Sequence, residues 1–455
     1  MMKQSKRTLA LFTVLALLIA AFGSAMASST IGGALQYDLS ADVNGGEALE
    51  LEFWYPEDVK AIVEKYAALY TEAHPNITFV FNSSPWDDYW TKLPMSISGG
   101  QGPDIFWMHN AYTDQMMGLM AAMPEDIFPM EALKADFRQV AEHLIDGKLY
   151  YIDTGLMSSI IMYNKAMWKD AGLSETELPK TWDEVLTAAK AMTKADAAGN
   201  IEVSGFSFNG DNGFANLVQA MNYQKGHFTF SADGTTSLYN DPVTIEHMEY
   251  LRSWYTDAKV GDHKGSVTYE AIASGKTAMI CDWTWIPGFV AADFPEIELG
   301  FFPTPAFGET PAAYDRNNGE CSPVVSDKSS DAEKAAAFDF VKWLLAGDDF
   351  IKEFSLAQGI FPSKFSLNDD PDIQANPLHQ VLAQTIDRTI WVGPLPSQIE
   401  SIVARYLQED FLNNGVSAAD AVKKTDELIA QELASGDLNF VPSERAYVGA
   451  ADFVN

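Results

Sequence analysis

The chain has only two cysteines, Cys281 and Cys321, in 455 residues. Two cysteines cannot build the disulfide framework of a small secreted domain, so the fold must depend on a hydrophobic core. The pair could form one disulfide in an oxidising compartment or remain as buried thiols, and the sequence leaves both open. Because the first cysteine stands at position 281, we expect no lipid anchor on an N-terminal cysteine.

Positive charge is also scarce. The 30 Lys and Arg residues face 63 Asp and Glu residues, which gives a formal net charge of −33. Nucleic acid and anionic lipid surfaces would be repelled by such a chain, so we expect neither as a partner.

Long hydrophobic runs are absent after the first 27 residues. Lys3, Lys6 and Arg7 precede an apolar run from Leu9 to Phe22, and the small residues of Ala25-Met26-Ala27 follow. This pattern predicts a cleavable signal peptide over residues 1–27 and a periplasmic or extracellular protein, with an uncleaved N-terminal anchor as the alternative.

Catalytic and metal-binding motifs are missing as well. Ser274-Gly275-Lys276-Thr277 resembles the end of a phosphate-binding loop, but Glu270 stands where its first glycine would be. The seven histidines include no i, i+4 pair, and no G-x-S-x-G sequence occurs. Oxygen-bearing residues around Gly199-Asn200 lack the alternate-position pattern of a calcium loop and predict a hairpin turn. We therefore expect no metal, no cofactor and no enzyme activity.

The sequence does contain alternating strand and helix patterns. Leu49 to Tyr55 alternates with period two, a helical pattern of apolar residues follows from Val59 to Tyr70, and Ile77 to Phe81 predicts a second strand. Short connections of this kind indicate parallel strands covered by helices. Further segments predicted as strands are Ile105–Met108, Ile160–Met162, Gly205–Phe208, Ala278–Trp283 and Ser322–Val325, whereas 368–377 is predicted as a loop.

Polar and aromatic residues follow several of these strands. Trp54 and Asp58 come at the end of the first strand, and Asn110 ends the third. Asp282 is followed by two further aromatic residues, Trp283 and Trp285, just before Pro287-Gly288 is expected to break the element. Ligands of open α/β sheets bind at the carboxyl ends of strands. Asp and Asn satisfy sugar hydroxyls and an indole covers a sugar's C–H face, although tryptophan in a core is the alternative.

Several longer motifs resemble those of extracellular sugar-binding proteins of ABC importers, the family that includes the maltose-binding proteins. They occur in the family's order over nearly the whole chain after residue 27: GGQGPDIFWMHN (99–110), IIMYNKAMWKDAGL (160–173), LPKTWDEVLTAAKAM (178–192), ASGKTAMICDWTW (273–285), AFDFVKWLL (337–345) and QGIFPSK (358–364).

The resemblance implies an α/β fold with two lobes of the type II periplasmic-binding kind, each a mainly parallel sheet flanked by helices, with C-terminal helices. We expect one lobe at 46–153 with 324–370 and the other at 158–320 with 378–440. Hinge segments are expected near 152–158, 321–326 and 368–378, so that the lobes close on a ligand by hinge motion.

The resemblance also implies the ligand contacts. Trp54 and Asp58 match a first-strand end that touches ligand, Asn110 matches a position where relatives often have an acid, and Asp282 matches a polar position. Trp285 matches the stacking aromatic, with Trp283 nearby as the expected packing residue. Trp391 is expected to give a second stacking face, and the loop of Asp211, Asn212 and Phe214 further sugar contacts.

Two departures argue against maltose itself, since Ala111 and Met157 stand where maltose-binding members carry an arginine and a glutamate. We expect a carbohydrate ligand, delivery to an ABC permease in the membrane, and a monomer. Two alternatives stay open: an exported carbohydrate-active enzyme, and the same fold binding a polyamine or an osmolyte.

Overall fold

The structure, a computed structural model, describes residues 30–208, 210, 213–262, 269–308, 310–393, 395–436 and 438, together with the backbone of 445–446. The predicted signal peptide and two predicted site residues, Asp211 and Asn212, lie outside the described residues. No helix within the described ranges is long and apolar enough to cross a membrane.

The first sheet is built around β3 (Leu49–Pro56), whose buried Leu51, Phe53 and Tyr55 alternate with partly exposed residues. This alternation confirms the predicted first strand. β3 pairs in parallel with β4 (Ile77–Ser84) and β5 (Ile105–Phe106), and β12 (Val324–Val325) pairs antiparallel with β5. The strand order is therefore β12-β5-β3-β4.

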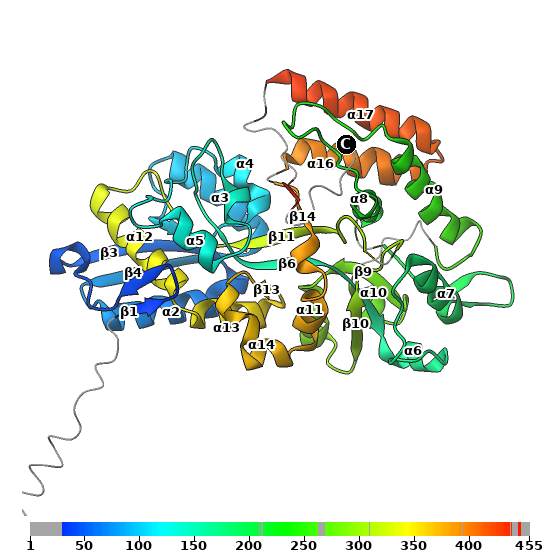
Figure 1. The fold of residues 1–455 in the computed structure, drawn as a ribbon, viewed down its shortest axis with the longest axis horizontal. Helices are drawn as coiled ribbons and strands as arrows, with labels where there is room; N and C mark the ends of the chain where they lie inside the picture. Colours follow the sequence, from blue (N-terminus) through cyan, green and yellow to red (C-terminus); the bar gives the residue numbers. More distant parts are fainter. Residues whose placement is uncertain are drawn as a thin grey trace, which may run out of the picture.

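Helices cover this first lobe (Figure 1). The connection from β3 to β4 is α2 (Lys60–Ala73), which buries its predicted apolar face against the sheet. The other helical segments of this part of the chain are η1 (Val43–Gly46), η2 (Glu57–Val59), α3 (Trp86–Ser98), η3 (Asn110–Tyr112), α4 (Thr113–Met116), α5 (Met130–Asp136), η4 (Val140–His143), α12 (Asp331–Ala346), α13 (Asp349–Gln358) and η5 (Phe365–Asp369), with the hairpin of β1 (Thr30–Gly32) and β2 (Gln36–Asp38) at the N-terminal side.

The strand β6 (Asp153–Asn164) joins the two halves of the molecule. Its first residues pair with β11 (Arg316–Cys321) and β13 (Phe361–Pro362), and its later residues pair with β9 (Met279–Trp283) and β10 (Leu299–Pro303). β11 also pairs in parallel with β14 (Ile390–Trp391), next to β15 (Arg445–Ala446). Figure 1 shows β6 and β11 running across the middle of the molecule from one helical lobe to the other.

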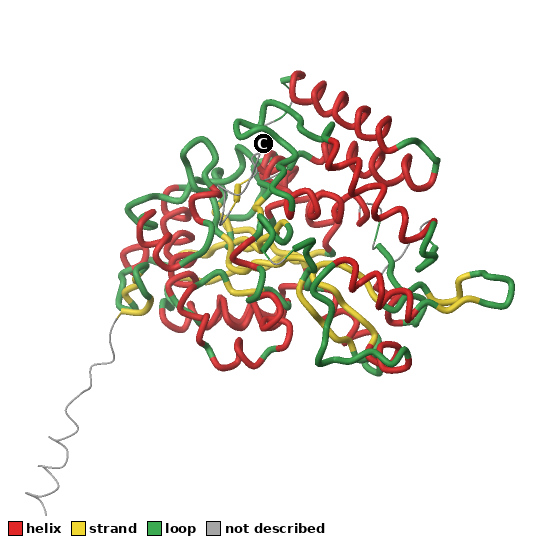
Figure 2. The backbone as a smooth tube through the Cα atoms, turned by 45° about the vertical axis from the view of Figure 1, so that its right-hand side comes forward, coloured by secondary structure: helices red, strands yellow, loops and turns green. Residues whose placement is uncertain are grey.

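Helices surround the strands of the second lobe as well. Figure 2 shows most of the strands in the middle of the molecule, with helices around them. α7 (Trp182–Met192) begins with the predicted capping box of Thr181 and Glu184. The remaining elements are α6 (Lys165–Asp170), β7 (Lys194–Ala195), β8 (Ile201–Val203), α8 (Gly213–Gln224), α9 (Pro242–Thr256), α10 (Tyr269–Ala273), α11 (Ile286–Asp293), α14 (Pro371–Ala375), α15 (Pro377–Leu382), η6 (Ile386–Arg388), α16 (Ser397–Val403), the π-helix η7 (Ala404–Asn413) and α17 (Ala418–Ser435).

The structure corrects four expectations. The second lobe is not mainly parallel, because β6 runs antiparallel to both of its neighbours, β9 and β10. Pro287 does not break the chain after β9 but lies in the first turn of α11, where its missing N–H has no intrahelical partner. Segment 205–208 forms only an isolated bridge, and the predicted loop 368–377 contains α14. The hairpin predicted around Gly199 is confirmed by β7 and β8.

Two large hydrophobic cores support a division into lobes. One contains buried residues from Leu35 to Ile152 and from Cys321 to Leu367, with Met157, and the other buried residues from Ile161 to Ile429. A third, smaller cluster packs around Ile160 and Ile280. The lobe boundaries given above stay a prediction that these cores support. Cys281 and Cys321 are both free thiols.

Candidate ligand-binding site

A cavity of about 200 Å³ lies where the two lobes meet. Asn110 and Ala111 reach it from the first lobe, Trp283 reaches it from the end of β9, and β11 contributes residues between the two. Its lining consists of Asn110, Ala111, Asn216, Gln219, Tyr239, Trp283, Arg316, Asn317, Asn318, Val392, Gly393, Leu395, Glu400 and Val403. The polar strand ends that the sequence predicts at Asn110 and Trp283 therefore meet in one cavity.

The strand β11 forms one wall of this cavity. Its burial alternates, so Arg316, Asn318 and Glu320 are partly exposed on one face while Asn317, Gly319 and Cys321 are buried. Arg316 and Asn318 line the cavity, and Glu320 projects from the same face two residues further on. A cation, an amide and a carboxyl thus follow one another along a single strand.

The guanidinium of Arg316 lies over the ring of Trp283. The guanidinium carbon lies 5.0 Å from the centroid of the indole, which is within the range of a cation–π contact. Its Nη1 donates to Asn216 Oδ1 at 2.8 Å and to Gln219 Oε1 at 3.0 Å. These contacts fix the plane of the guanidinium and leave further N–H groups of Arg316 for the oxygen atoms of a ligand.

Two buried amide oxygens of the cavity have no partner among the described residues. Asn110 is 4% exposed and Asn317 is 1% exposed, and in both the side-chain oxygen accepts no hydrogen bond. The amide nitrogen of Asn317 donates to Thr389 Oγ1 at 2.7 Å, which leaves the amide oxygen of this cavity-lining residue without a partner. Buried acceptors without donors are costly, and hydroxyl groups of a ligand would supply the donors.

A histidine and a carboxyl adjoin the cavity on the first-lobe side. His109 Nε2 lies 3.4 Å from Asn318 Nδ2 and 3.8 Å from Glu320 Oε1. Burial lowers the pKa of His109 to about 4. Burial, with a smaller contribution from the negative charge of Asp58, raises the pKa of Glu320 to about 8. At neutral pH the pair is therefore mainly an uncharged imidazole beside an uncharged carboxylic acid.

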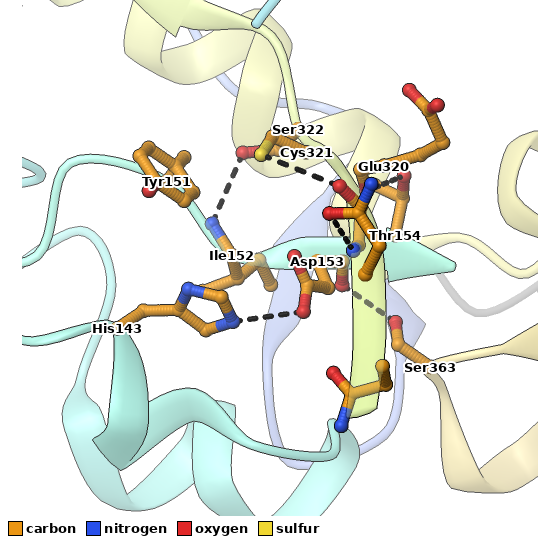
Figure 3. Close-up of polar contacts among 12 residues, drawn as sticks. His143, Tyr151, Ile152, Asp153, Thr154, Glu320, Cys321, Ser322 and Ser363 are labelled. Carbon is orange, nitrogen blue, oxygen red and sulfur yellow. Dashed lines mark hydrogen bonds and ion pairs between the residues drawn. The ribbon is translucent and has the colours of Figure 1, made fainter. Parts of the chain in front are cut away.

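A polar junction of three chain segments lies where β11 pairs with the start of β6 (Figure 3). His143 Nε2 lies 2.8 Å from Asp153 Oδ2, and both side chains are fully buried. Thr154 Oγ1 donates to the carbonyl of Glu320, and Ser363 Oγ donates to the carbonyl of Asp153. A Cβ at Gly319 would overlap the Asp153 carboxylate, so glycine is needed where β11 passes β6. This junction fixes how β6, β11 and the segment after β13 cross.

The structure brings only part of the predicted set to the cavity. Asn110 and Trp283 line it. Trp54 is partly exposed at the end of β3, where its Nε1 donates to Glu52, and Asp58 follows on the surface of η2. Both lie on the first-lobe side, and Asp58 is close enough to Glu320 to affect its pKa.

Other predicted residues lie elsewhere. Trp285 packs edge-on against Tyr269 and Phe289, and it does not line the cavity. Asp282 points to the opposite face of β9 from Trp283, since neighbouring strand residues alternate. Phe214 is fully buried in the second-lobe core beside Phe411. Trp391 is 2% exposed, and its ring centroid lies 4.4 Å from that of His143. We leave Phe214 and Trp391 out of the proposed site because neither of them lines the cavity.

Four residues that line the cavity were not predicted from the sequence: Arg316, Asn318, Asn216 and Gln219. The segment RNNGEC of β11 contains no apolar alternation, although its concentration of amide side chains between two apolar segments is a usable signal. No group of three or more metal-ligating side chains occurs among the described residues.

A larger cavity of about 490 Å³ lies on the outside of the first lobe between α2 and α13. Its lining is mainly apolar, with Tyr66, Trp343 and Phe350, and Lys65 pairs there with Glu353 at 2.5 Å. It contains none of the polar residues at strand ends, so we place the ligand site in the cavity between the lobes despite its smaller volume.

Two lobes joined by crossing strands, with a polar and aromatic cavity between them, define a two-lobed binding protein. The chain belongs to the family of bacterial extracellular solute-binding proteins, whose model matches residues 54–346. It is 23% identical over 402 residues to a maltotriose-binding protein of Pyrococcus abyssi, covering 82% of this chain and 83% of the relative. It is 26% identical over 349 residues to a diacetylchitobiose-binding protein of Streptomyces coelicolor, covering 72% and 76%.

The fold also matches that of a cyclic α-maltosyl-1,6-maltose-binding protein from Arthrobacter globiformis. The TM-score is 0.71 at 21% identity, and the match covers 86% of this chain and 100% of the other. The α/β two-lobed fold expected from the sequence is confirmed.

Proposed function

We propose that the chain is the solute-binding component of an ABC importer and that it captures a carbohydrate in the cavity between the lobes. The observation that carries this proposal is the pair of unpartnered amide oxygens of Asn110 and Asn317 beside the indole of Trp283. Oxygens that need donors and a ring that covers apolar C–H groups match the two kinds of surface that a sugar presents. The sugar-binding relatives support the same ligand class.

Arg316 completes this chemistry. A sugar hydroxyl is both a donor and an acceptor. Its O–H can donate to the oxygen of Asn110 or Asn317, and its oxygen can accept from an N–H of Arg316. Because Trp283 and the amides of α8 hold the guanidinium in place, little side-chain entropy is lost when a ligand binds.

The strands β6 and β11 run from one lobe to the other (Figure 1). We propose that the lobes close around the ligand by bending at these strands. The ligand would then leave when the lobes open on a membrane permease. We propose export of the protein through the predicted signal peptide, no lipid anchor, a monomeric state, and binding without covalent chemistry. The permease and the monomeric state rest on membership of the family.

A thermal-shift screen of the purified protein against a sugar panel tests the proposal. A ligand at a hundredfold excess over its dissociation constant stabilises the folded state by about 2.7 kcal/mol. We expect one class of mono- or oligosaccharide to raise the melting temperature and to be recovered chemically unchanged. Conversion of the sugar would instead support the exported enzyme, and a shift only with polyamines or betaines would support the other alternative.

A further inference from the structure

The face of β11 that lines the cavity through Arg316 and Asn318 continues to Glu320, next to the cavity, and carries opposite charges at its two ends. Arg316 stands at one end, Asn318 in the middle and Glu320 at the other. At about 3.3 Å per strand residue, the Cα atoms of Arg316 and Glu320 are about 13 Å apart. This separation leaves room for one or two sugar rings along the strand, so the two ends can contact different parts of one ligand.

The Glu320 end is rich in acceptors and poor in donors. The side chain of Glu320 is 15% exposed, its Oε1 lies 3.8 Å from His109 Nε2, and the indole N–H of Trp107 is the one other donor beside the carboxyl among the described groups that act on it. Asp58 adds a second carboxylate nearby. Asn110, next in the chain to His109, adds the buried side-chain oxygen that has no partner in the described structure. A ligand group at this end must therefore bring hydrogen-bond donors.

We propose, on the basis of the proposed function, that the Glu320 end of the cavity takes the protonated amine of an amino sugar. An ammonium group has three donors and no acceptor, which fits a carboxyl pair and an amide oxygen. The edge-on contact of Trp86 with His109 at 5.5 Å places an aromatic side chain on the same wall. The net charge of −33 also attracts a cationic solute rather than an anionic one.

The protonation state of Glu320 gives this binding a proton signature. The titratable groups around Glu320 are His109, Asp58 of η2, Asp153 of β6 and Cys321 on its own strand. Burial and the two aspartates keep Glu320 protonated in the unliganded protein at pH 6.5, because they raise its pKa to about 8. An arriving ammonium favours the carboxylate, so Glu320 gives its proton to the buffer when the ligand binds.

Calorimetric titration in buffers of different ionisation enthalpy measures this proton. The ligands are glucosamine and its β-1,4-linked dimer, each compared with the N-acetylated and the 2-hydroxy sugar of the same skeleton. At pH 6.5 we expect the amino sugars to bind most tightly and to release about one proton per site. The acetylated and hydroxy sugars should release none.

Glu320→Gln should weaken amino-sugar binding roughly 30-fold or more and abolish the proton release, because it removes one partner of a buried charge pair. The affinity for the neutral sugars should fall less than the affinity for the amino sugars. Glu72→Gln removes the same charge from the exposed side of α2 and should change nothing. Asp58→Asn, at an exposed position, should weaken amino-sugar binding less, and it tests the cavity if Glu320→Gln does not fold.

Each other outcome overturns this inference. Neutral sugars that bind tightly while amino sugars bind weakly or release no proton would leave the proposed function standing and remove the amine site. No binding of any sugar would remove both.

Discussion

Replacing Trp283 by alanine removes the aromatic wall of the cavity at the end of β9. The indole is partly exposed, and one face of it carries the guanidinium of Arg316. If a sugar covers about 60 Å² of indole surface, its burial contributes roughly 1.5 kcal/mol at ~25 cal/mol per Å². Specific stacking adds about 0.5–1.5 kcal/mol. We expect Trp283→Ala to weaken sugar binding about 30- to 150-fold.

The matched control is Trp285→Ala, two residues further along the chain. Trp285 packs against Tyr269 and Phe289, and against the first-lobe core and the third, smaller cluster, rather than lining the cavity. We expect this variant to lose about 3 kcal/mol of unfolding free energy and to keep its affinity for the sugar.

Titration calorimetry and urea unfolding of the two variants separate affinity from stability. Trp283→Ala should lower affinity with a loss of stability near 1 kcal/mol, the size of its cation–π contact. If Trp285→Ala abolishes binding and Trp283→Ala leaves it intact, the sugar stacks on Trp285. The ligand site is then not the cavity that Trp283 lines.

Three further outcomes test the account. Asn110→Leu should lower sugar affinity at least tenfold and leave urea stability unchanged or about 1 kcal/mol higher, since it removes an unpartnered buried oxygen; a large loss of stability would contradict this. Lys364→Met should lower the free energy of unfolding, measured with urea, by about 3 kcal/mol. The buried ammonium donates to three carbonyls at the end of α12 and pairs with Asp348. A change below about 1 kcal/mol would show that these contacts do not stabilise the fold. The free energy of unfolding of the wild type should fall by up to about 4 kcal/mol between pH 4.5 and 8, because folded Glu320 keeps a proton that the unfolded chain releases near pH 4.5. Glu320→Gln should remove this dependence of stability on pH. An unchanged dependence in the variant would show that another group causes it.

The strands of the first lobe could be predicted because their burial follows simple periodicity. In β3 the apolar residues Leu51, Phe53 and Tyr55 face the core and polar residues lie between them. The same logic fails for β11, whose buried residues include Asn317 and Gly319. Asn317 is buried by a hydrogen bond to Thr389, and Gly319 by its close approach to Asp153. No hydrophobic pattern reports either cause.

The site residues divide in the same way. Asn110 and Trp283 could be found because they follow buried strands. The sequence analysis expected Trp285 to stack on the ligand and Trp283 to pack, but in the structure Trp283 lines the cavity and Trp285 does not. The directions of these side chains depend on where β9 ends and α11 begins, which the sequence pattern does not define. Phe214 and Trp391 were expected at the site from the family resemblance, and only the packing of α8 and β14 places them in the interior.

The most direct test of the central claim is a calorimetric titration of the sugar found in the screen into the wild type and into the double variant Asn110→Leu, Trp283→Ala. We expect saturable binding at one site per chain in the wild type, with the sugar recovered unchanged. We expect loss of binding in the double variant, which should still unfold cooperatively. Full affinity in the folded double variant would contradict a carbohydrate site in the cavity along β11.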